Sequence, residues 1–400
     1  MTFEEVNKYI MISIKEALHK VTETTHKLES IEVDLIEALG SVLSKNIISP
    51  IEMPPFSQSA MDGYAICGES VTYEVIGEIQ AGATDTGRPL SKGEAVRIFT
   101  GAMIPEGTTA IAKQEIVTKE GSSITLLEKV REGMSIRIKG EEIALNDIAL
   151  TAGTYLNPAA IGFLSGLGIQ KVSVIRKPKI AIIVTGNELT KPGEKLLPGR
   201  IYESNSATLT SVLKHAGFDS SVVTVKDDYN STKDTIGSAI EQNDLVIITG
   251  GISVGDYDFV GKALAELQVD EVFYKVKQKP GKPLFYGKKG NKSVFGLPGN
   301  PAAVLTCFYI YVLPAIKTLI GKSSSMLEER KVALLHDFTK KGDRAHLLKA
   351  YINSEGVKVH TGQSSAMLSS FVGANSLIYL SEEDREIKAG DKVSVYMLPV

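Results

Sequence analysis

Cysteine is scarce in this sequence. Cys67 and Cys307 are the only two in 400 residues, and they lie far apart along the chain. Such a pair gives neither a disulfide framework nor the close spacing of a zinc site, and it suits a reducing compartment. We expect both to be buried small hydrophobic side chains rather than reactive thiols.

An excess of charge of either sign is also missing. Lys plus Arg number 44 and Asp plus Glu number 47, which gives a net charge of −3. Nothing in this balance favours nucleic acid or an anionic membrane, so any anion site must be built locally. With 43% hydrophobic and 23% charged residues the chain is globular rather than disordered. Its length predicts two to four domains.

A secretion signal and a membrane span are not indicated. The first 20 residues carry Glu4, Lys8 and Lys15 among their apolar positions, so they resemble an amphipathic helix rather than a signal peptide. The segment 293–316 has no charged residue, but it begins with the turn sequence GLPGNP and Pro314 interrupts its end. We therefore expect a buried helix there and a cytoplasmic protein without a membrane partner.

Changes in composition along the chain predict an α/β multidomain fold. An elongated helical and β unit is expected from 1–50 plus 143–178, interrupted by a small inserted β domain at 51–142, where short alternating runs are separated by turn signals. An α/β domain is expected at 179–325 and a C-terminal β barrel at 326–400.

Local patterns predict individual elements within this map. Asn157 is a candidate N-cap for a helix over 158–167, with Gly168 as its stop. In the α/β part, strand-length apolar runs alternate with helical periods, which is typical of βαβ units and a parallel sheet. The expected strands are 180–184, 221–225 and 245–249, and the expected helices are 205–215, 232–241 and 259–267. Short C-terminal strands are expected at 331–335, 347–352, 357–360 and 392–397.

A glycine-rich loop follows the strand that begins at Leu245. Its glycines and small residues are Gly250, Gly251, Ser253 and Gly255. Without side chains, the backbone N–H groups of such a loop can approach a phosphate. A double glycine alone more often makes a tight turn that binds nothing, but the neighbouring loops favour the phosphate site.

Carboxylates follow three of the predicted strands. They are Glu188, Asp227, Asp228, Asp256 and Asp258. Ligands bind at the carboxyl ends of the strands of such a sheet, and carboxylates beside a phosphate site usually hold Mg²⁺. One or two of the five are expected to be helix caps or solvated loop acids instead.

Lysines and prolines form the next pattern. Lys275, Lys279 and Lys282 belong to a run that ends in a Pro-Gly-Lys-Pro turn. A run of charge is usually a solvated face, but the prolines restrict this backbone and favour Lys279 and Lys282 as a cationic wall for an oxyanion. Downstream, Pro301 is expected at the first position of the apolar helix.

The segment SAMDGYA at 59–65 is dense in rigid and polar residues. Asp62 within it is either functional or part of an Asx turn before Gly63, and the residues alone leave both interpretations open. Thr100 and Gly101 are ambiguous in the same way.

Seven motifs together resemble the molybdopterin molybdenumtransferase family, which includes the carboxyl-terminal enzyme domain of gephyrin. The resemblance covers essentially the whole chain. Its motifs are SAMDGYA at 59–65, RIFTGAMIPEG at 97–107, TGNEL at 185–189, GRIYESN at 199–205, TGGISVGDYD at 249–258, KPGKP at 279–283 and GLPGNP at 296–301.

This resemblance implies a reaction and an assembly. Members of the family hydrolyse adenylylated molybdopterin with Mg²⁺ and molybdate, release AMP and place the metal on the dithiolene. They are homodimers in which the β domain of one subunit faces the α/β domain of the other, and a molybdopterin adenylyltransferase is a possible further partner. A non-catalytic molybdopterin-binding scaffold and a tungstate-preferring homologue are the alternative functions.

The resemblance also implies a role for each matching residue. Asp62 and Thr100 would enter the partner's active site, and Glu188, Asp228 and Asp258 would position Mg²⁺ and the attacking water. The phosphate would be held by the backbone of Gly250, Gly251, Ser253 and Gly255. Charge would be neutralised by Lys275, Lys279 and Lys282, the largest expected catalytic contribution, and the pocket would be shaped by Pro283, Pro298 and Pro301.

The sequence departs from the family at the oxyanion site. Lys349 stands where the family has an arginine, and a lysine keeps the charge but loses the planar fork. Arg344 is the alternative residue for this role. The serine of the same site corresponds to Ser369 or Ser370.

Overall fold

The structure is a computed structural model of the whole chain and describes residues 11–225, 228–252, 259–324 and 326–399. These residues form two compact units. The first contains the described residues up to Ile31, Gly40–Ser44 and the described chain from Ser173 onward. The second contains Glu32–Leu39 and Lys45–Val172. The predicted division into four domains, with other boundaries, stays a prediction.

A six-stranded sheet forms the centre of the first unit. In spatial order its strands are β17 (Ser221–Val225), β14 (Ile180–Thr185), β18 (Leu245–Thr249), β22 (Lys292–Leu297), β21 (Phe285–Lys289) and β19 (Asp270–Tyr274). The first four are parallel, as the sequence predicts. Strand β21 runs antiparallel to both of its neighbours, β22 and β19, which was not predicted from the sequence. Only Gly290 and Asn291 join β21 to β22, and so short a connection can link only antiparallel strands.

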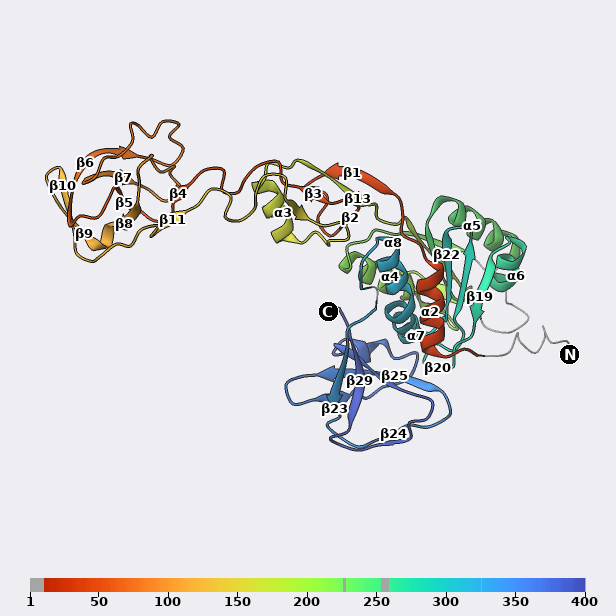
Figure 1. Ribbon diagram of the computed structural model, residues 1–400. Coiled ribbons are helices and arrows are strands. Elements are labelled where there is room, and N and C mark those ends of the chain that lie inside the picture. Colours follow the sequence, from red (N-terminus) through yellow and green to blue (C-terminus); the bar gives the residue numbers. More distant parts are fainter. Residues whose placement is uncertain (1–10, 226–227, 253–258, 325, 400) are drawn as a thin grey trace. The chain divides into compact units, whose positions relative to one another are not determined.

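Helices cover both faces of this sheet (Figure 1). One face is covered by α2 (Ile14–Thr24), α4 (Asn205–His215), α7 (Pro301–Cys307), the π-helical segment Phe308–Val312 and α8 (Leu313–Leu319). The other face is covered by α5 (Tyr229–Gln242) and α6 (Phe259–Glu266). Strand β14 is apolar on both faces, which is why helices cover both. Ile180 and Ile182 point into the core on the side of α2 and α4, and Ala181 and Ile183 point into the core on the side of α5 and α6.

The uncharged segment forms a core helix. Pro301 occupies its first turn, as predicted. Among the described helices, the stretch Pro301–Leu319 alone has the length and apolar character of a membrane span, and 83% of it is buried inside the protein. That burial is what a helix in the core of a folded domain shows.

The C-terminal part of the first unit is a largely antiparallel sheet. Its strands are β23 (Glu329–Ala333), β25 (Ala345–Ile352), β26 (Val357–Val359), β27 (Ser376–Leu380) and β29 (Lys392–Met397). Strands β24 (Phe338–Thr339) and β28 (Glu386–Ile387) form a separate pair, and Leu368–Phe371 is a 3₁₀ turn. A bridge between Leu334 and Val357 links the two ends of this sheet. Ala345 and Leu347 belong to the core under α7, whereas Leu348 and Ala350 face a separate C-terminal core. The barrel itself stays a prediction.

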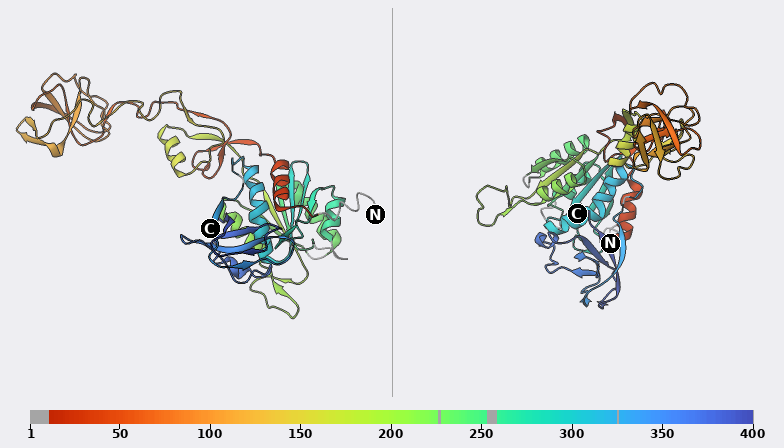
Figure 2. Two further views of the ribbon diagram at one scale, coloured as in Figure 1. Left: turned by 60° about the horizontal axis from the view of Figure 1, so that its bottom comes forward. Right: turned by 90° about the vertical axis from the view of Figure 1, so that its left-hand side faces the viewer.

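Shorter strands complete the first unit. They are β2 (Val42–Leu43), β15 (Leu189–Thr190), β16 (Ile201–Tyr202) and β20 (Gln278–Lys279), while β1 (Ser30–Asp34) and β13 (Lys171–Ile175) lie where the chain passes between the units. The segment between β15 and β16 extends away from the sheet (Figure 2). Strand β20 pairs with β25, so it joins the α/β part to the C-terminal sheet.

The second unit is built mainly of strands. Its elements are β3 (Ile47–Ile48), β4 (Gln58–Ser59), β5 (Gly63–Ile66), β6 (Thr72–Ile79), β7 (Glu94–Ile98), β8 (Ala110–Lys113), the 3₁₀ turn Gln114–Ile116, β9 (Val117–Glu120), β10 (Ser123–Leu126), β11 (Ile136–Arg137), β12 (Ile148–Leu150) and α3 (Pro158–Gly166). Six of them form one sheet in the order β8-β5-β7-β6-β10-β9. The predicted cap is confirmed, because the Asn157 side chain accepts a hydrogen bond from the Ala160 N–H.

The two cysteines differ. Cys307 is buried in the core, and burial raises the pKa of its thiol to about 12, so it is unreactive as predicted. The prediction of burial is wrong for Cys67, which is only half-buried, because it lies just beyond the end of β5 at the edge of a core cluster.

Candidate active site

A cavity of about 720 Å³ opens at the carboxyl ends of β14, β18 and β22. This is the edge where a parallel α/β sheet binds its ligands. Loops from the C-terminal sheet complete the wall, with Arg344, Ser365 and Ala366. The cavity therefore uses parts of the chain that lie more than a hundred residues apart in the sequence.

Eight of the predicted site residues line this cavity. They are Glu188, Gly250, Lys279, Lys282, Pro283, Pro298, Pro301 and Arg344. Seven of them come from four of the quoted motifs, TGNEL, TGGISVGDYD, KPGKP and GLPGNP, and Arg344 comes from the C-terminal part of the chain.

The glycine loop lies at the end of β18. Gly250 has a φ of +90°, and a Cβ there would lie 2.5 Å from the backbone oxygen of Thr185. Gly251 also has a positive φ, and its Cβ would lie 2.9 Å from Thr185 Oγ1. A side chain is therefore excluded at both positions, and the backbone of Gly250 faces the cavity directly. Ser253, Gly255 and Asp258, which the sequence places in the same loop, lie outside the described residues.

Asn205 connects two loops of the wall. Its Nδ2 donates to Thr249 Oγ1 and to the backbone oxygen of Gly299, both at 2.8 Å. Asn300 Nδ2 in turn donates to Ser365 Oγ at 2.9 Å. This chain of bonds fixes the turn before α7 against both the sheet edge and the C-terminal part.

Three cations face the cavity. Lys279 and Lys282 belong to the rigid Pro-Gly-Lys-Pro turn and are exposed to it, and Arg344 donates from Nη1 to the backbone oxygen of Gln278 at 3.2 Å. A neighbouring histidine lies close to two of these cations, Lys279 and Arg344. Burial, and then the positive charges of Lys279, Lys340 and Arg344, lower the pKa of His346 to about 4.

Asp227, Asp256 and Asp258 lie outside the described residues, so only Glu188 and Asp228 of the five predicted carboxylates can be located. Glu188 is exposed in the wall and folds against Gly186, where a Cβ would lie 2.8 Å from a Glu188 oxygen. Glu203 also lines the cavity, but its oxygens accept from the N–H and hydroxyl of Ser206. Asp228 is the N-cap of α5, and its hydrogen bonds with Ser231 lower its pKa. Within the described ranges, no group of three His, Cys, Asp or Glu side chains could hold a metal ion.

Other predicted residues do not line this cavity in the described part of the chain. They are Asp228, Gly251, Lys275, Lys349, Ser369 and Ser370. The Lys275 ammonium lies over the Tyr274 ring at 4.8 Å. The Ser370 hydroxyl donates to the backbone oxygens of Gly362 and Met367. The roles predicted for these residues stay predictions.

Lys349 is the most deeply buried of them, at 2% exposure. Its ammonium donates to the backbone oxygens of Gly362, Ser364 and Met367 at 2.9, 3.2 and 3.1 Å. Burial lowers its pKa. The side chain thus holds together the loop that carries Ser365 to the cavity.

Asp62 and Thr100 lie in the second unit, next to each other. One Asp62 oxygen accepts from both the N–H and the hydroxyl of Thr100, at 2.8 Å each, and these bonds lower the Asp62 pKa. Both side chains are exposed. The structure therefore joins two motifs that lie far apart in the sequence into one local arrangement.

Sequence reasoning missed the polar floor of the cavity. Thr185 Oγ1 and Asn205 Oδ1 are buried and have no hydrogen-bond partner among the described residues, which fits a site that a polar ligand completes. Both lie inside quoted motifs, TGNEL and GRIYESN. Thr185 ends β14 and Asn205 begins α4, and these positions at the ligand-binding edge of the sheet could have marked them as site residues. Ser365 carried no such signal, because only the C-terminal fold brings it to the cavity.

Comparison with known protein families covers most of the chain. Residues 12–168 match the MoeA N-terminal region (domain I and II), and residues 181–318 match a probable molybdopterin binding domain. Residues 331–398 match the MoeA C-terminal region (domain IV).

Full-length relatives match as well. Proteins named molybdopterin molybdenumtransferase from Staphylococcus epidermidis and Staphylococcus aureus are 33% and 31% identical, each over 98% of this chain and 97% of the relative. A crystal structure of the molybdopterin biosynthesis MoeA protein from Pyrococcus horikoshii OT3 matches with a TM-score of 0.83 at 29% identity, over 97% of this chain and all of that one. The similarity therefore extends over both units rather than over one domain.

Proposed function

Because the chain belongs to the molybdopterin molybdenumtransferase family and is thus a transferase of molybdenum cofactor biosynthesis, we propose that its α/β cavity is where adenylylated molybdopterin is hydrolysed. In this proposal AMP leaves, and molybdenum from molybdate is placed on the dithiolene. Both molybdate and the pterin are substrates.

One observation carries the proposal. Lys279, Lys282 and Arg344 converge with the Glu188 carboxylate on a single cavity at the carboxyl edge of the sheet. A phosphoanhydride and an oxyanion are both multiply negative, and three fixed cations in one cavity stabilise such charge more strongly than they would in open water.

The donor chemistry at the cavity fits Mg²⁺. This ion is usually held by one or two carboxylates together with substrate phosphates, so Glu188 supplies a suitable ligand. Asp228 and Asp258 are the further ligands that the sequence predicts. When bound, Mg²⁺ would neutralise the charge on the phosphate oxygens during hydrolysis.

The chain's own residues then have separate tasks. The backbone at Gly250 receives a phosphate, and Lys279 and Lys282 neutralise the charge that develops as water attacks phosphorus and the phosphoanhydride P–O bond breaks. Arg344 holds the oxyanion beside them with its planar fork. No covalent protein nucleophile is required.

We also propose a homodimer with a shared site, in the cytoplasm. The exposed pair Asp62 and Thr100 supports it, because an acid held with a low pKa on a surface loop is available to a second subunit. In that assembly Asp62 contributes to the site of the partner copy.

The test is a titration of AMP release. Purified protein is incubated with adenylylated molybdopterin and Mg²⁺ in three arms, with no oxyanion, with molybdate or with tungstate. We expect AMP release to accelerate with molybdate. Acceleration by tungstate instead would identify a tungstate-preferring homologue, and tight pterin binding without AMP release would identify a scaffold and contradict the proposal.

A further inference from the structure

A buried polar network lies directly beneath the cations of the cavity. Gln278, the first residue of β20, is 0% exposed and immediately precedes Lys279. Its Nε2 donates to the backbone oxygen of Gly281 at 3.1 Å and lies 3.6 Å from Cys307 Sγ. Its Oε1 accepts a hydrogen bond from the hydroxyl of Tyr311. The side chain thus ties the turn between Lys279 and Lys282 to the core helix.

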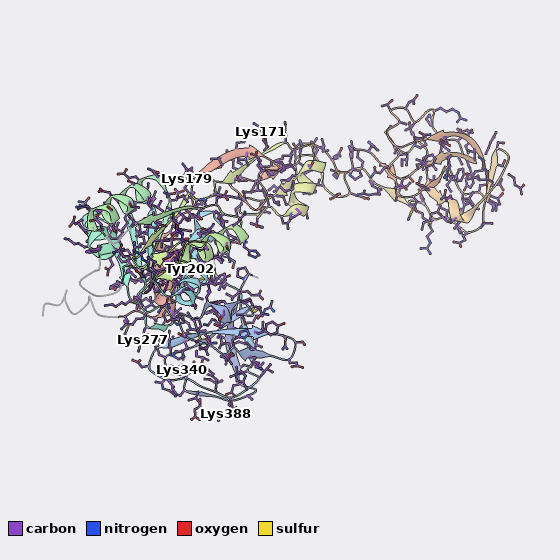
Figure 3. The ribbon with its side chains drawn as sticks, turned by 180° about the vertical axis from the view of Figure 1, so that it is seen from behind. Lys171, Lys179, Tyr202, Lys277, Lys340 and Lys388 are labelled. Atoms are coloured by element: carbon purple, nitrogen blue, oxygen red, sulfur yellow. The ribbon has the colours of Figure 1, made fainter. Side chains whose placement is uncertain are left out.

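The backbone of the same residue holds the third cation. The Gln278 carbonyl accepts from Arg344 Nη1 at 3.2 Å, and β20 pairs with β25 of the C-terminal sheet. In Figure 3, Lys277 marks the beginning of this segment and Lys340 the beginning of the loop that carries Arg344. Gln278 is therefore the one described residue that is bonded both to the Lys279–Lys282 turn and to Arg344.

The turn between Lys279 and Lys282 is packed tightly against Cys307 and Gln278. Gly281 has a φ of +82°, and a Cβ there would lie 2.4 Å from Cys307 Sγ and 2.9 Å from Gln278 Nε2. Cys307 and Tyr311 are fully buried in the apolar core. Burying an amide and a phenol in such a core is costly unless their hydrogen bonds are made, so this network is expected to have a single arrangement.

We propose that Gln278 is a positioning residue that fixes the spacing of Lys279, Lys282 and Arg344, and thereby sets the affinity of the cavity for its oxyanion substrate. The proposal rests on the proposed function for the identity of the anion. Gln278 itself touches no substrate. It acts through the turn above it, and a displacement of about 1 Å in such a charged site can cost up to a hundredfold.

Three variants separate this role from a merely structural one. Gln278→Met removes the bond to Gly281 and also leaves the Tyr311 hydroxyl buried without an acceptor. Tyr311→Phe keeps the Gly281 bond but deprives Gln278 Oε1 of its donor. The double variant removes both polar partners, so it regains stability relative to Gln278→Met, because removing both partners of a bond costs less than orphaning one.

The measurements are calorimetric titration of molybdate into each full-length protein, urea unfolding, and molybdate-dependent AMP release. We expect Gln278→Met to weaken molybdate binding roughly tenfold or more. AMP release should fall with it, because the displaced lysines also neutralise the charge of hydrolysis. Tyr311→Phe should lose stability with an affinity near that of the natural chain. The double variant should recover stability but keep the weak affinity.

Tyr286→Phe is the matched control. It removes a fully buried phenol hydroxyl whose partners, Thr24 and Thr25, do not line the cavity in the described structure, so its molybdate affinity should be unchanged. An unchanged affinity in Gln278→Met, or affinity that recovers with stability in the double variant, would overturn the proposal. So would a natural chain that binds no molybdate. Binding without AMP release would count against the proposed activity alone.

Discussion

Two lysines of the C-terminal sheet are buried without a carboxylate among their hydrogen-bond partners in the described structure. Lys340 donates to the backbone oxygens of Gly342, Arg344 and Glu382, and Lys349 donates to three carbonyls of the loop that carries Ser365. An ammonium has three donors, and here each is used on backbone. These side chains therefore shape the loops that reach the cavity.

Lys349→Met should lower the free energy of unfolding by about 2–3 kcal/mol, because it leaves three loop carbonyls without their charged donor. Lys349→Arg should lower it less, since the charge remains but a planar fork fits three converging oxygens poorly. Urea unfolding measures both, with the exposed Lys358→Met as control. If Lys349→Arg instead tightens oxyanion half-saturation at unchanged stability, the side chain serves the oxyanion, as the family resemblance implies.

Lys279 and Lys282 differ from these lysines, because their ammonium groups are exposed to the cavity. Lys279→Met and Lys282→Met should each reduce molybdate-dependent AMP release at least tenfold, a typical cost of removing one charge-stabilising group. Lys277→Met is the matched control, because Lys277 is close in sequence and is not part of the described cavity wall. Equal losses in all three variants would indicate a general charge effect rather than a site.

At the scale of elements, the cavity depends on how closely β14 and β18 approach at their ends. Gly250→Ala places a Cβ 2.5 Å from the Thr185 carbonyl at a φ of +90°, so the backbone must move. We expect at least a tenfold loss of AMP release. Gly290→Ala is the control, because Gly290 has a φ of +58° but open space around it. It should cost about 1 kcal/mol of stability with full activity, and a similar activity loss in both would contradict this account.

Elements with a local signal were predictable from the sequence. β-branched runs predicted β14 and β18, and Asn157 and Pro301 marked helix starts, because caps and periodicity act within a few residues. Antiparallel β21 was not predicted, although the two-residue connection Gly290–Asn291 to β22 was a local signal for a hairpin. The placement of Arg344 and Ser365 in the cavity depends on the pairing of β20 with β25, a contact between distant segments that no local pattern encodes.

At the scale of the whole molecule, the proposed shared site predicts complementation between two inactive chains. Asp62→Asn and Glu188→Gln should each reduce AMP release strongly as homodimers. A mixed dimer places both changes in one site and leaves the other site intact, so activity should return. The measurement uses differently tagged chains, co-expressed and purified through both tags. A mixed dimer no more active than its parents would show that both residues act within one subunit, or that Asp62 has no role.

Acid sensitivity of the whole fold follows from His346. It is 6% exposed and faces Lys279, Lys340 and Arg344, with a pKa of about 4 against an ordinary 6.5. The folded chain therefore keeps it neutral where the unfolded chain takes up a proton. The free energy of unfolding should fall as the pH is lowered from about 6.5 to about 4, by up to about 3 kcal/mol from this residue.

His346→Gln removes the ionisable ring and keeps a polar side chain of similar size, so its stability should depend less on pH across that window. Urea unfolding at pH 7.5, 6 and 5 measures the difference between the two proteins. His19→Gln is the control, because its side chain is 74% exposed on α2 and should leave the pH dependence unchanged. If His346→Gln loses stability between pH 6.5 and 5 as steeply as the natural chain, another group causes the acid sensitivity, and burial and the nearby cations lower the pKa of His346 less than its surroundings imply.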